Sequence, residues 1–430
     1  MYKSSIYNIY IPYCEDIYVW NTSVCSITKL EKRYVEMIEH EDFDNPDLKR
    51  LINDLLKQKI IVPKEEDEFL DMLKKQHKER LNSSSKQLSL IIAPTLNCNF
   101  NCFYCFERNQ RQQGIMSSET VDKIVLFVEQ FIEQNKSIEI LSIKWFGGEP
   151  LLAFDNVISP LSVKLISLCK SKNIKYIAEL VTNGYYLNTE VAKKLICDYN
   201  VDRFQITFDG IEETTCIRKG IRKEDYRKVK DNMFNLAEMI EKHNDKAKIK
   251  LRLNIDKNNE KEIKSFLQEI KNDARFRSSI SIYLGRLRCC TKTDLSLSEY
   301  ENVNFQFELD NNIKTILPSP RKFWCSQYEN NSFCIGPKGE LYKCEHHFGD
   351  EGKVVGNVGC GVCGGDFYQK YMKMPISNKC KRCKLYPICL GGCPNERFNK
   401  QDVNCEYTEQ YLIEKVKHYI NIKENKNGNN

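Results

Sequence analysis

The sequence feature that most constrains the fold is an alternation of short apolar runs with amphipathic stretches between residues 88 and 285. The apolar runs are Leu88–Ala93, Ile138–Phe146, Tyr176–Thr182, Arg203–Phe208, Ile249–Ile255 and Ile280–Leu284. Helix-like stretches separate them near residues 118–134, 158–172, 189–198, 225–243 and 259–272. Strands that alternate with helices in this way are typical of a parallel β/α sheet or barrel, which carries its chemistry at the carboxyl ends of the strands. We therefore expect an α/β core with functional residues just after these runs.

The cysteine content is the second constraint, because 20 of the 430 residues are cysteine. The chain is too long for a small disulfide-stapled scaffold, and the polar, tyrosine-rich segment Met1–Pro12 does not resemble a secretory signal. None of the apolar runs approaches the roughly 18 residues that cross a bilayer. We therefore expect a cytoplasmic protein without a membrane partner, in which many cysteines act as thiolate ligands of metals.

The charges do not indicate a nucleic-acid partner. The net charge of +6 is the small difference between 65 basic and 59 acidic residues, which are interspersed along the chain. Mixed charges of this kind are typical of a solvated surface. We expect no nucleic acid among the partners.

Three cysteines follow the first apolar run directly. Cys98, Cys102 and Cys105 form a CxxxCxxC arrangement. Each iron of a cubane [4Fe–4S] cluster takes a terminal ligand, so three thiolates leave one iron open for a substrate or cofactor. A structural zinc site, which would need a closed set of ligands, and plain buried thiols are the alternatives.

Polar residues follow the next four runs. The second run ends in Gly147-Gly148-Glu149-Pro150, where the glycines permit close backbone approach and Glu149 can accept from an ammonium group. The other candidates at strand ends are Thr182, Asn183, Thr207, Asp209 and Asn254. Because Asn-Gly and Asp-Gly are common turn dipeptides, a turn or cap role is the alternative for these residues.

This region resembles the radical S-adenosylmethionine (SAM) superfamily, whose CxxxCxxC motif has an aromatic residue before its last cysteine, here Tyr104. The resemblance extends over roughly residues 88–285 and implies a partial (β/α)6 barrel. In that family the amino and carboxylate groups of SAM chelate the open iron, and SAM is cleaved to a 5′-deoxyadenosyl radical that abstracts hydrogen. The resemblance further implies SAM contacts from Tyr104, Gly147, Gly148, Glu149, Thr182, Asn183, Thr207, Asp209 and Asn254.

A second set of cysteines lies between residues 325 and 405. It is similar to the seven-cysteine SPASM extension of radical SAM enzymes, which binds two auxiliary 4Fe-4S clusters and would bring the total to three. The resemblance assigns Cys325, Cys344 and Cys393 to the first auxiliary cluster and Cys380, Cys383, Cys389 and Cys405 to the second. Two zinc ribbons are the alternative for these cysteines.

The first auxiliary cluster lacks a fourth ligand in this assignment. Cys334, Cys360 and Cys363 are the candidates, with Cys334 favoured by its position, and an open iron would suit a thiol substrate. A plain buried cysteine is the alternative for Cys334. Glu345 follows Cys344 and is a candidate catalytic base, or else a simple surface carboxylate.

Residues 1–80 contain strand-like runs followed by helix-like segments, an order that suggests a winged-helix-like module. It resembles the element of peptide-modifying radical SAM proteins that binds a leader peptide along an edge strand; a structural cap over the barrel is the alternative. The expected order is a recognition module over 1–80, a linker over 81–87, the radical SAM partial barrel over 88–290, a bridging region over 291–324, the SPASM domain over 325–410, and a C-terminal helix with a disordered tail over 411–430.

The combined resemblance implies a radical SAM enzyme that modifies a ribosomally made precursor peptide by hydrogen abstraction. The product would be a thioether or another crosslink, and the partners would be the leader-bearing precursor and a flavodoxin- or ferredoxin-type electron donor. An anaerobic sulfatase-maturating enzyme making formylglycine is the alternative, although those enzymes have Asp where this chain has Glu345. A noncatalytic iron-sulfur protein that binds peptides or transfers electrons is the alternative from another class.

Overall fold

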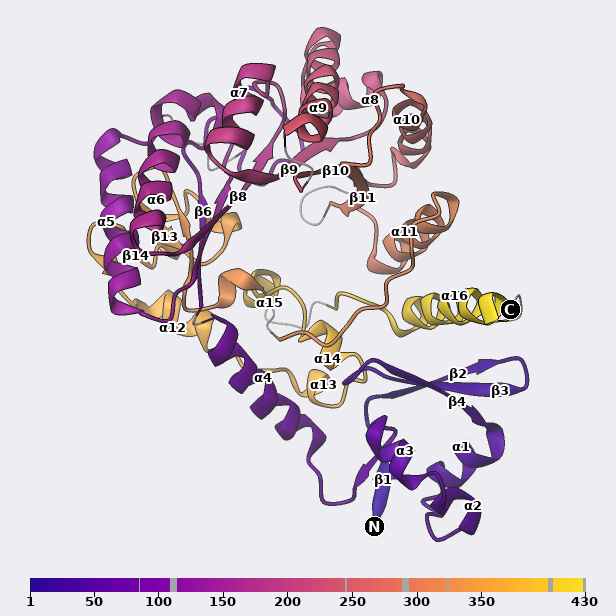
Figure 1. Cartoon of the computed structure of the whole chain (residues 1–430). Helices are drawn as coiled ribbons and strands as arrows, with labels where there is room; N and C mark the ends of the chain where they lie inside the picture. The colour runs from indigo at the N-terminus through magenta and orange to yellow at the C-terminus, as the bar shows by residue number, and fades with distance from the viewer. Residues whose placement is uncertain are drawn as a thin grey trace. The chain divides into compact units, whose positions relative to one another are not determined.

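The computed structural model describes residues 1–84, 86–108, 114–243, 246–287, 294–322, 325–400 and 405–427 (Figure 1). The chain divides into two compact units. Unit 1 consists of Met1–Asn82, Ser296–Cys325 and Lys373–Asn430, and unit 2 consists of Ser83–Leu295 and Ser326–Met372. The expected joint near residue 290 lies outside the described residues.

Unit 2 is built on a ten-stranded sheet in the order β11-β10-β9-β8-β7-β6-β12-β13-β14-β15. Its first part consists of β6 (Gln87–Ile92), β7 (Ile140–Trp145), β8 (Lys175–Thr182), β9 (Val201–Phe208), β10 (Lys248–Ile255) and β11 (Ile280–Arg286). Each of these strands pairs in parallel with the next one along the chain. The predicted α/β alternation is therefore confirmed, and the carboxyl ends of all six strands lie at the same edge of the sheet.

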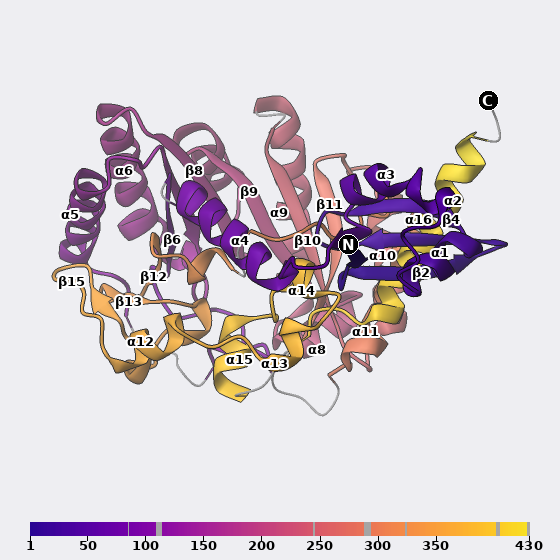
Figure 2. The same ribbon diagram turned by 90° about the horizontal axis from the view of Figure 1, so that it is seen from below.

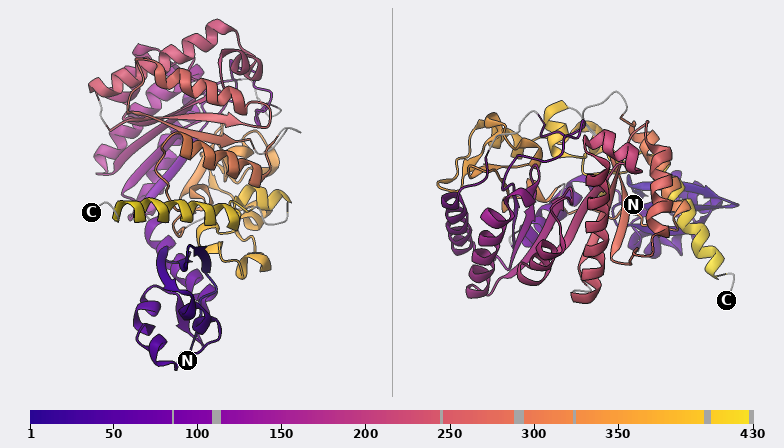
Figure 3. Two further views of the ribbon diagram at one scale, coloured as in Figure 1. Left: turned by 90° about the vertical axis from the view of Figure 1, so that its right-hand side faces the viewer. Right: turned by 90° about the horizontal axis from the view of Figure 1, so that it is seen from above.

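Helices follow the strands at the predicted places and lie along one face of the sheet (Figure 3). They are α5 (Ser118–Gln134), α6 (Ser159–Ser171), α7 (Thr189–Lys193), α9 (Lys223–His243) and α10 (Glu260–Asn272), with short turns η1 (Pro150–Ala153), η2 (Phe154–Ile158) and η3 (Lys194–Asp198). Helix α8 (Glu212–Lys219) was not predicted. Its sequence EETTCIRK contains two apolar residues, Cys216 and Ile217, which are adjacent, so no apolar residues repeat at helical spacing.

One helical stretch of the described residues, Pro150–Ser171, is long and apolar enough to cross a membrane by length and composition alone. Leu161 and Leu165 of this stretch are fully buried. Because a core helix of a globular protein passes the same test, this stretch is weak evidence for a membrane span.

The second part of the sheet comes from the cysteine-rich region. Strand β12 (Ser332–Ile335) pairs in parallel with β6, and β13 (Glu340–Tyr342), β14 (Gly356–Asn357) and β15 (Gly361–Val362) continue antiparallel (Figure 2). All four residues of β12 are buried. Residues 326–372 therefore extend the central sheet, a pairing that local sequence patterns do not reveal.

Unit 1 contains the predicted order of strands and then helices. Strands β2 (Asn8–Tyr13), β3 (Asp16–Asn21) and β4 (Ser26–Glu31) form an antiparallel sheet, and β1 (Tyr2–Ser4) pairs with β5 (Ile61–Pro63). The helices between them are α1 (Lys32–Glu39), α2 (Pro46–Lys49) and α3 (Ile52–Lys57). Among the described residues, the remaining helices are α4 (Glu68–Ser84), α11 (Leu297–Asp310), α12 (Asp366–Met372), α13 (Asn378–Lys381), α14 (Tyr386–Cys389), α15 (Pro394–Lys400) and α16 (Glu409–Asn427). The 3-10 turns η4 (Ser326–Tyr328), η5 (Glu345–His347) and η6 (Glu351–Lys353) complete this list, whereas η2 and η3 are π-helical.

Both faces of the three-stranded sheet are covered. Successive side chains of a strand point to opposite faces, and accordingly Val19 packs with the core of α1–α3 whereas Tyr18 and Trp20 pack with α16. The edges of β2 and β4 carry no further strand among the described residues.

The segment expected as a linker over 81–87 contains the boundary between the two units, which falls after Asn82. It is helical up to Ser84, because α4 continues through it. The tail expected to be disordered at the end of residues 411–430 is helical up to Asn427, so that expectation was wrong. Its polar residues find partners within unit 1, since Tyr18 donates a hydrogen bond to the Glu424 carboxylate and the Lys423 ammonium lies over the Tyr419 ring.

Candidate functional site

The loop after β6 carries the three cysteines of the CxxxCxxC arrangement, and all three are half-buried. The Cys105 amide donates to the Cys102 carbonyl at 3.2 Å, and the Phe100 amide donates to Cys98 Sγ at 3.4 Å. Burial raises the pKa of the Cys102 thiol, and the Lys219 ammonium opposes this shift. We call residues 94–108 the cluster loop.

The cluster loop rests on the backbone of the Gly147-Gly148 dipeptide, which follows β7. The Gly148 amide donates to the Thr95 carbonyl at 3.2 Å, and the Glu149 amide donates to the Asn97 carbonyl at 2.8 Å. A Cβ atom on Gly148 would lie 2.2 Å from that Asn97 oxygen, and one on Gly147, where φ is +104°, would lie 2.5 Å from the Thr95 oxygen. Only glycine therefore permits this approach at both positions.

Glu149 joins the ends of β7 and β8. Its side chain is fully buried, and its carboxylate accepts hydrogen bonds from Thr182 Oγ1 at 2.7 Å, from the Asn183 amide at 2.8 Å and from the Leu151 amide at 3.0 Å. Burial raises the pKa of Glu149 to about 7 although these hydrogen bonds lower it. A buried carboxylate held in this way is suited to pair with a cation.

Asn183 connects this carboxylate to the cluster loop. Its side-chain amide donates to Asn99 Oδ1 at 2.8 Å and lies 3.8 Å from Cys98 Sγ. The residues predicted at the ends of β7 and β8 are thus brought together beside the cysteines.

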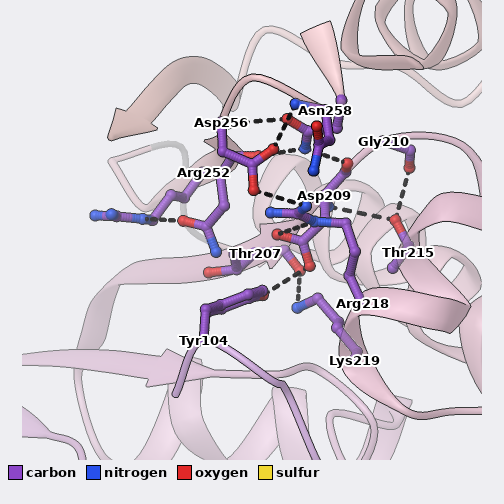
Figure 4. Close-up of polar contacts among 12 residues, drawn as sticks. Tyr104, Thr207, Asp209, Gly210, Thr215, Arg218, Lys219, Arg252, Asp256 and Asn258 are labelled. Atoms are coloured by element: carbon purple, nitrogen blue, oxygen red, sulfur yellow. Dashed lines mark hydrogen bonds and ion pairs between the residues drawn. The ribbon is translucent and has the colours of Figure 1, made fainter. Parts of the chain in front are cut away.

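The ends of β9 and β10 form a second buried cluster, shown in Figure 4. The Tyr104 hydroxyl donates to the Asp209 carboxylate at 2.6 Å. Burial raises the pKa of Tyr104, with the neighbouring Asp209 carboxylate adding to the shift and a hydrogen bond with Asn254 opposing it. Thr207 contributes its backbone carbonyl, which accepts from Lys219 Nζ at 2.7 Å. The residues predicted at these strand ends therefore also gather around the cluster loop.

Three buried charged residues of this cluster were missed by the sequence reasoning. Arg218 Nη1 pairs with the Asp256 carboxylate at 2.9 Å, and its Nε lies 4.0 Å from Asp209. Lys219 is the third of these residues and is also buried. The only local signal was Gly220, which ends α8 with a φ of +61°.

Helix α8 also holds the cluster loop in place. The Asn101 amide donates to the Lys219 carbonyl at 2.9 Å, and the Phe103 amide donates to the Arg218 carbonyl at 3.2 Å. The Arg218 guanidinium lies 5.1 Å from the centre of the Phe103 ring. Within the described residues, Arg218 Nε and Nη2 and Asp209 Oδ1 have no hydrogen-bond partner.

Four cysteines of unit 1 line a cavity of about 190 Å³. They are the predicted second set, Cys380, Cys383, Cys389 and Cys405. Burial and the neighbouring cysteines raise the pKa of Cys380 to about 11. Helix α4 packs against this region through Phe69, whose ring centre lies 5.3 Å from that of Tyr386.

The form of this cavity bears on the zinc-ribbon alternative. A single zinc ion draws its ligands to about 2.3 Å from one point, and no group of three or more His, Cys, Asp or Glu in the described part of the chain could hold such an ion. A cluster of four irons and four sulfides fills a chamber, with its thiolates around the wall. The cavity therefore suits an iron-sulfur cluster better than a zinc ion.

The cysteines predicted for the first auxiliary cluster are distributed over both units. Cys325 and Cys393 belong to unit 1, and Cys344 belongs to unit 2. Cys334 is fully buried in an apolar cluster with Ile91. This environment is typical of a core cysteine, and the ligand set of this cluster stays a prediction.

The segment after Cys344 borders the cluster loop. The His346 ring stacks on Phe106 with ring centres 4.0 Å apart. Phe106 directly follows Cys105 in the loop and also stacks on Phe146, with ring centres 6.4 Å apart. Glu345, the predicted base, is half-buried beside His346, so it lies on the side of unit 2 that carries the cluster loop.

The sequence of this core matches a known family. Residues 92–270 match the model of the Radical SAM superfamily. This segment is a radical SAM domain. The predicted resemblance is thereby confirmed, and such a domain implies SAM and a [4Fe–4S] cluster as cofactors.

The radical SAM domain and its surroundings also resemble individual proteins. Cysteine-type anaerobic sulfatase-maturating enzymes of Clostridium novyi (strain NT) and Clostridium perfringens (strain 13 / Type A) are each 24% identical, over 74% and 75% of this chain and 89% and 94% of the relatives. The structure of native anSMEcpe with bound AdoMet and Cp18Cys peptide aligns with a TM-score of 0.53 and 20% identity over 78% of this chain and 96% of that chain. Streptococcus suis SuiB bound to precursor peptide SuiA aligns with a TM-score of 0.51 and 15% identity over 94% and 98%. The two structures show a shared fold.

The contact between Gly148 and the cluster loop can be tested by adding a methyl group. Gly148→Ala would place Cβ against backbone oxygens that have no alternative position, so we expect a loss of about 1–3 kcal/mol and a thermal midpoint lower by a few degrees. Gly365→Ala is the matched control, because no atom lies within 4 Å of its added Cβ. Equal thermal midpoints for the two variants would contradict the packing described.

The buried Glu149 carboxyl predicts a specific pH dependence. Its pKa rises from 4.5 to about 7 on folding, so the folded SAM-free chain binds a proton that the unfolded chain releases between these pH values. Stability from this group is present below pH 4.5 and is lost as the pH rises to about 7, by on the order of 3 kcal/mol. Urea unfolding of the wild type and of Glu149→Gln at pH 5 and 7.5 measures how the difference in their free energies of unfolding changes with pH. A stability gap between the two proteins that does not change with pH would contradict the raised pKa.

Proposed function

We propose that this chain is a radical SAM enzyme that modifies a ribosomally made precursor peptide after translation. The observation that carries the proposal is the link between the buried Glu149 carboxylate and the three-cysteine loop at the strand ends of a radical SAM domain. Asn183 makes this link, because its backbone amide donates to Glu149 and its side chain lies beside Cys98. The relatives add support, because one is a sulfatase-maturating enzyme and two structures with a similar fold contain a bound peptide. The described strands β6–β11 would be the partial (β/α)6 barrel, and residues 325–410 the SPASM domain.

The residues of unit 2 fit SAM and its cluster. Cys98, Cys102 and Cys105 would hold three irons, and Glu149 would accept hydrogen bonds from the amino group of SAM. Arg218 Nη2, which lacks a hydrogen-bond partner in the described residues, would donate to an anionic group of SAM. When bound, SAM and the cluster supply a 5′-deoxyadenosyl radical that abstracts hydrogen. Tyr104, Gly147, Gly148, Thr182, Asn183, Thr207, Asp209 and Asn254 would shape the pocket around SAM.

The cysteine-lined cavity of unit 1 fits an auxiliary cluster. Its wall offers four thiolates, the number that a closed [4Fe–4S] cluster requires. A further auxiliary cluster would be held by Cys325, Cys344 and Cys393, with an open iron or a fourth ligand from Cys334, Cys360 or Cys363. The two auxiliary clusters would accept the electron that the substrate radical gives up, and a flavodoxin- or ferredoxin-type protein of the cytoplasm would supply electrons to the SAM cluster.

The N-terminal module would bind the leader of the precursor. Helices cover both faces of its three-stranded sheet, so the edge of β4 or of β2 is the remaining place where a peptide could add as a further strand. If Cys325, Cys344 and Cys393 hold the first auxiliary cluster without a fourth protein ligand, that cluster would offer a binding site for a substrate thiol, and a thioether would be the expected product. Without a free iron, a carbon-carbon crosslink or another oxidation is the expected product.

Anaerobic sulfatase maturation is the second candidate function. The two curated relatives named above favour it, whereas Glu345 in place of the Asp of those enzymes counts against it. Incubation of the protein with a sulfatase-derived Cys or Ser peptide distinguishes the two functions. Formylglycine would form only if the protein is a sulfatase-maturating enzyme. A noncatalytic iron-sulfur protein would release no 5′-deoxyadenosine with any peptide.

The number of clusters is tested by iron and sulfide quantitation with Mössbauer spectroscopy on anaerobic protein. We expect about twelve irons per chain, falling to about eight in the Cys98→Ala/Cys102→Ala/Cys105→Ala variant. A variant with Ala at the four cavity cysteines of unit 1 should also lose about four irons. Zinc in place of these last irons, or only four irons in the wild type, would contradict the auxiliary clusters.

Glu345 as a base is tested by separating radical formation from product formation. In Glu345→Gln we expect 5′-deoxyadenosine to form at the wild-type rate and modified peptide to form at least about 100-fold more slowly, since a general base contributes 10²–10⁴-fold. Glu351→Gln is the control, because Glu351 is exposed in the same unit. Full product formation by Glu345→Gln would remove this residue from the mechanism.

A further inference from the structure

Two exposed cysteines lie at the sheet edge of unit 2, outside the site described above. Cys360 precedes β15 and Cys363 follows it, and their Sγ atoms are 3.8 Å apart. The Cys360 amide donates to the Asn357 carbonyl at 3.0 Å, and the Cys363 amide donates to the Val355 carbonyl at 2.8 Å. Both thiols are therefore carried on a fixed backbone and face solvent.

The spacing of the two sulfurs matches the geometry of a metal site. A tetrahedral zinc ion with Zn–S bonds of about 2.3 Å holds two of its thiolate ligands about 3.8 Å apart. A disulfide would require about 2.05 Å between the same atoms. Terminal thiolates of a cubane cluster sit on separate irons and lie farther apart than ligands of a single ion. The pair is thus spaced as two ligands of one ion.

The backbone between the cysteines includes Gly361, whose φ of +79° lies in the left-handed region that favours glycine. The Sγ atoms of both cysteines lie 3.9 Å from the Gly361 carbonyl oxygen, so the two thiols lie on the same side of this turn. Both cysteines are exposed, so an ion can reach the pair from solvent.

We propose that Cys360 and Cys363 form a surface binding site for zinc or a similar soft divalent cation. No third ligand joins the two thiolates within the described residues, so water completes the coordination of the ion. The site is separate from the clusters proposed above, and its two cysteines are then not the fourth ligand of the first auxiliary cluster.

This proposal is tested by measuring the zinc and iron contents of the full protein. The anaerobic protein is first loaded with its clusters and then equilibrated with a small excess of Zn²⁺. We expect about one zinc per chain in the wild type, and at least about tenfold weaker zinc binding in Cys360→Ser and in Cys363→Ser, with iron unchanged. The exposed Cys197 of the same unit provides the matched control, Cys197→Ser, which should keep the zinc. X-ray absorption at the zinc edge should show two sulfur ligands at about 2.3 Å.

Three outcomes overturn the proposal. Zinc binding that survives in Cys360→Ser/Cys363→Ser places the ion elsewhere. Loss of iron in either single variant makes that cysteine a cluster ligand instead. Failure of the wild type to retain zinc against a weak chelator removes the site. None of these results bears on the SAM cluster, which the three cysteines of the cluster loop would hold.

Discussion

The backbone contact between the Gly147-Gly148 dipeptide and the cluster loop is the constraint on which the site depends. It ties the loop that carries the three cysteines to the end of β7 through two backbone hydrogen bonds. Because the contact leaves no space for a Cβ, it fixes the distance between loop and strand. Glu149 follows Gly148 directly in the sequence. Its side chain therefore lies at the ends of β7 and β8, where it accepts hydrogen bonds from Thr182 and Asn183.

Buried charges anchor the opposite side of the loop. Burying an ion costs several kcal/mol unless a partner compensates it. Arg218 pairs with Asp256, and Tyr104 donates to Asp209. Such a network is stable only when all its members are present, so helix α8 and the cluster loop hold each other in position. Arg218 Nη2, which has no hydrogen-bond partner in the described residues, is then available to donate to a ligand.

Much of the core of unit 2 could be predicted from the sequence, because the apolar pattern of each strand or helix lies within that element. The six parallel strands and the helix over Ser118–Gln134 follow from apolar runs and amphipathic periods of ordinary length. The candidate residues at the strand ends follow from the topology, since parallel strands bring their carboxyl ends to one edge. Glu149, Thr182 and Asn183 were found in this way, and the structure places them in one hydrogen-bonded group.

The features that were missed depend on contacts between distant segments. Helix α8 is short and contains buried charges in place of an apolar stripe, so only its tertiary partners make it recognisable. Strand β12 joins β6 across more than two hundred residues of chain. Helix α16 extends into a polar tail, where Tyr18 of β3 donates a hydrogen bond to Glu424. Local propensity cannot report such partners.

We propose that the cluster loop and Glu149 together bind and activate SAM. This role is tested by the release of 5′-deoxyadenosine from anaerobic, dithionite-reduced protein in which Cys380, Cys383, Cys389 and Cys405 are replaced by Ala, so that the auxiliary cluster proposed for these cysteines is absent. We expect this variant still to release 5′-deoxyadenosine from SAM, and the further change Glu149→Gln to slow the release at subsaturating SAM. Absence of release from the cluster-loaded wild type, or an equal release rate with and without the Glu149 carboxylate, would rule out this role.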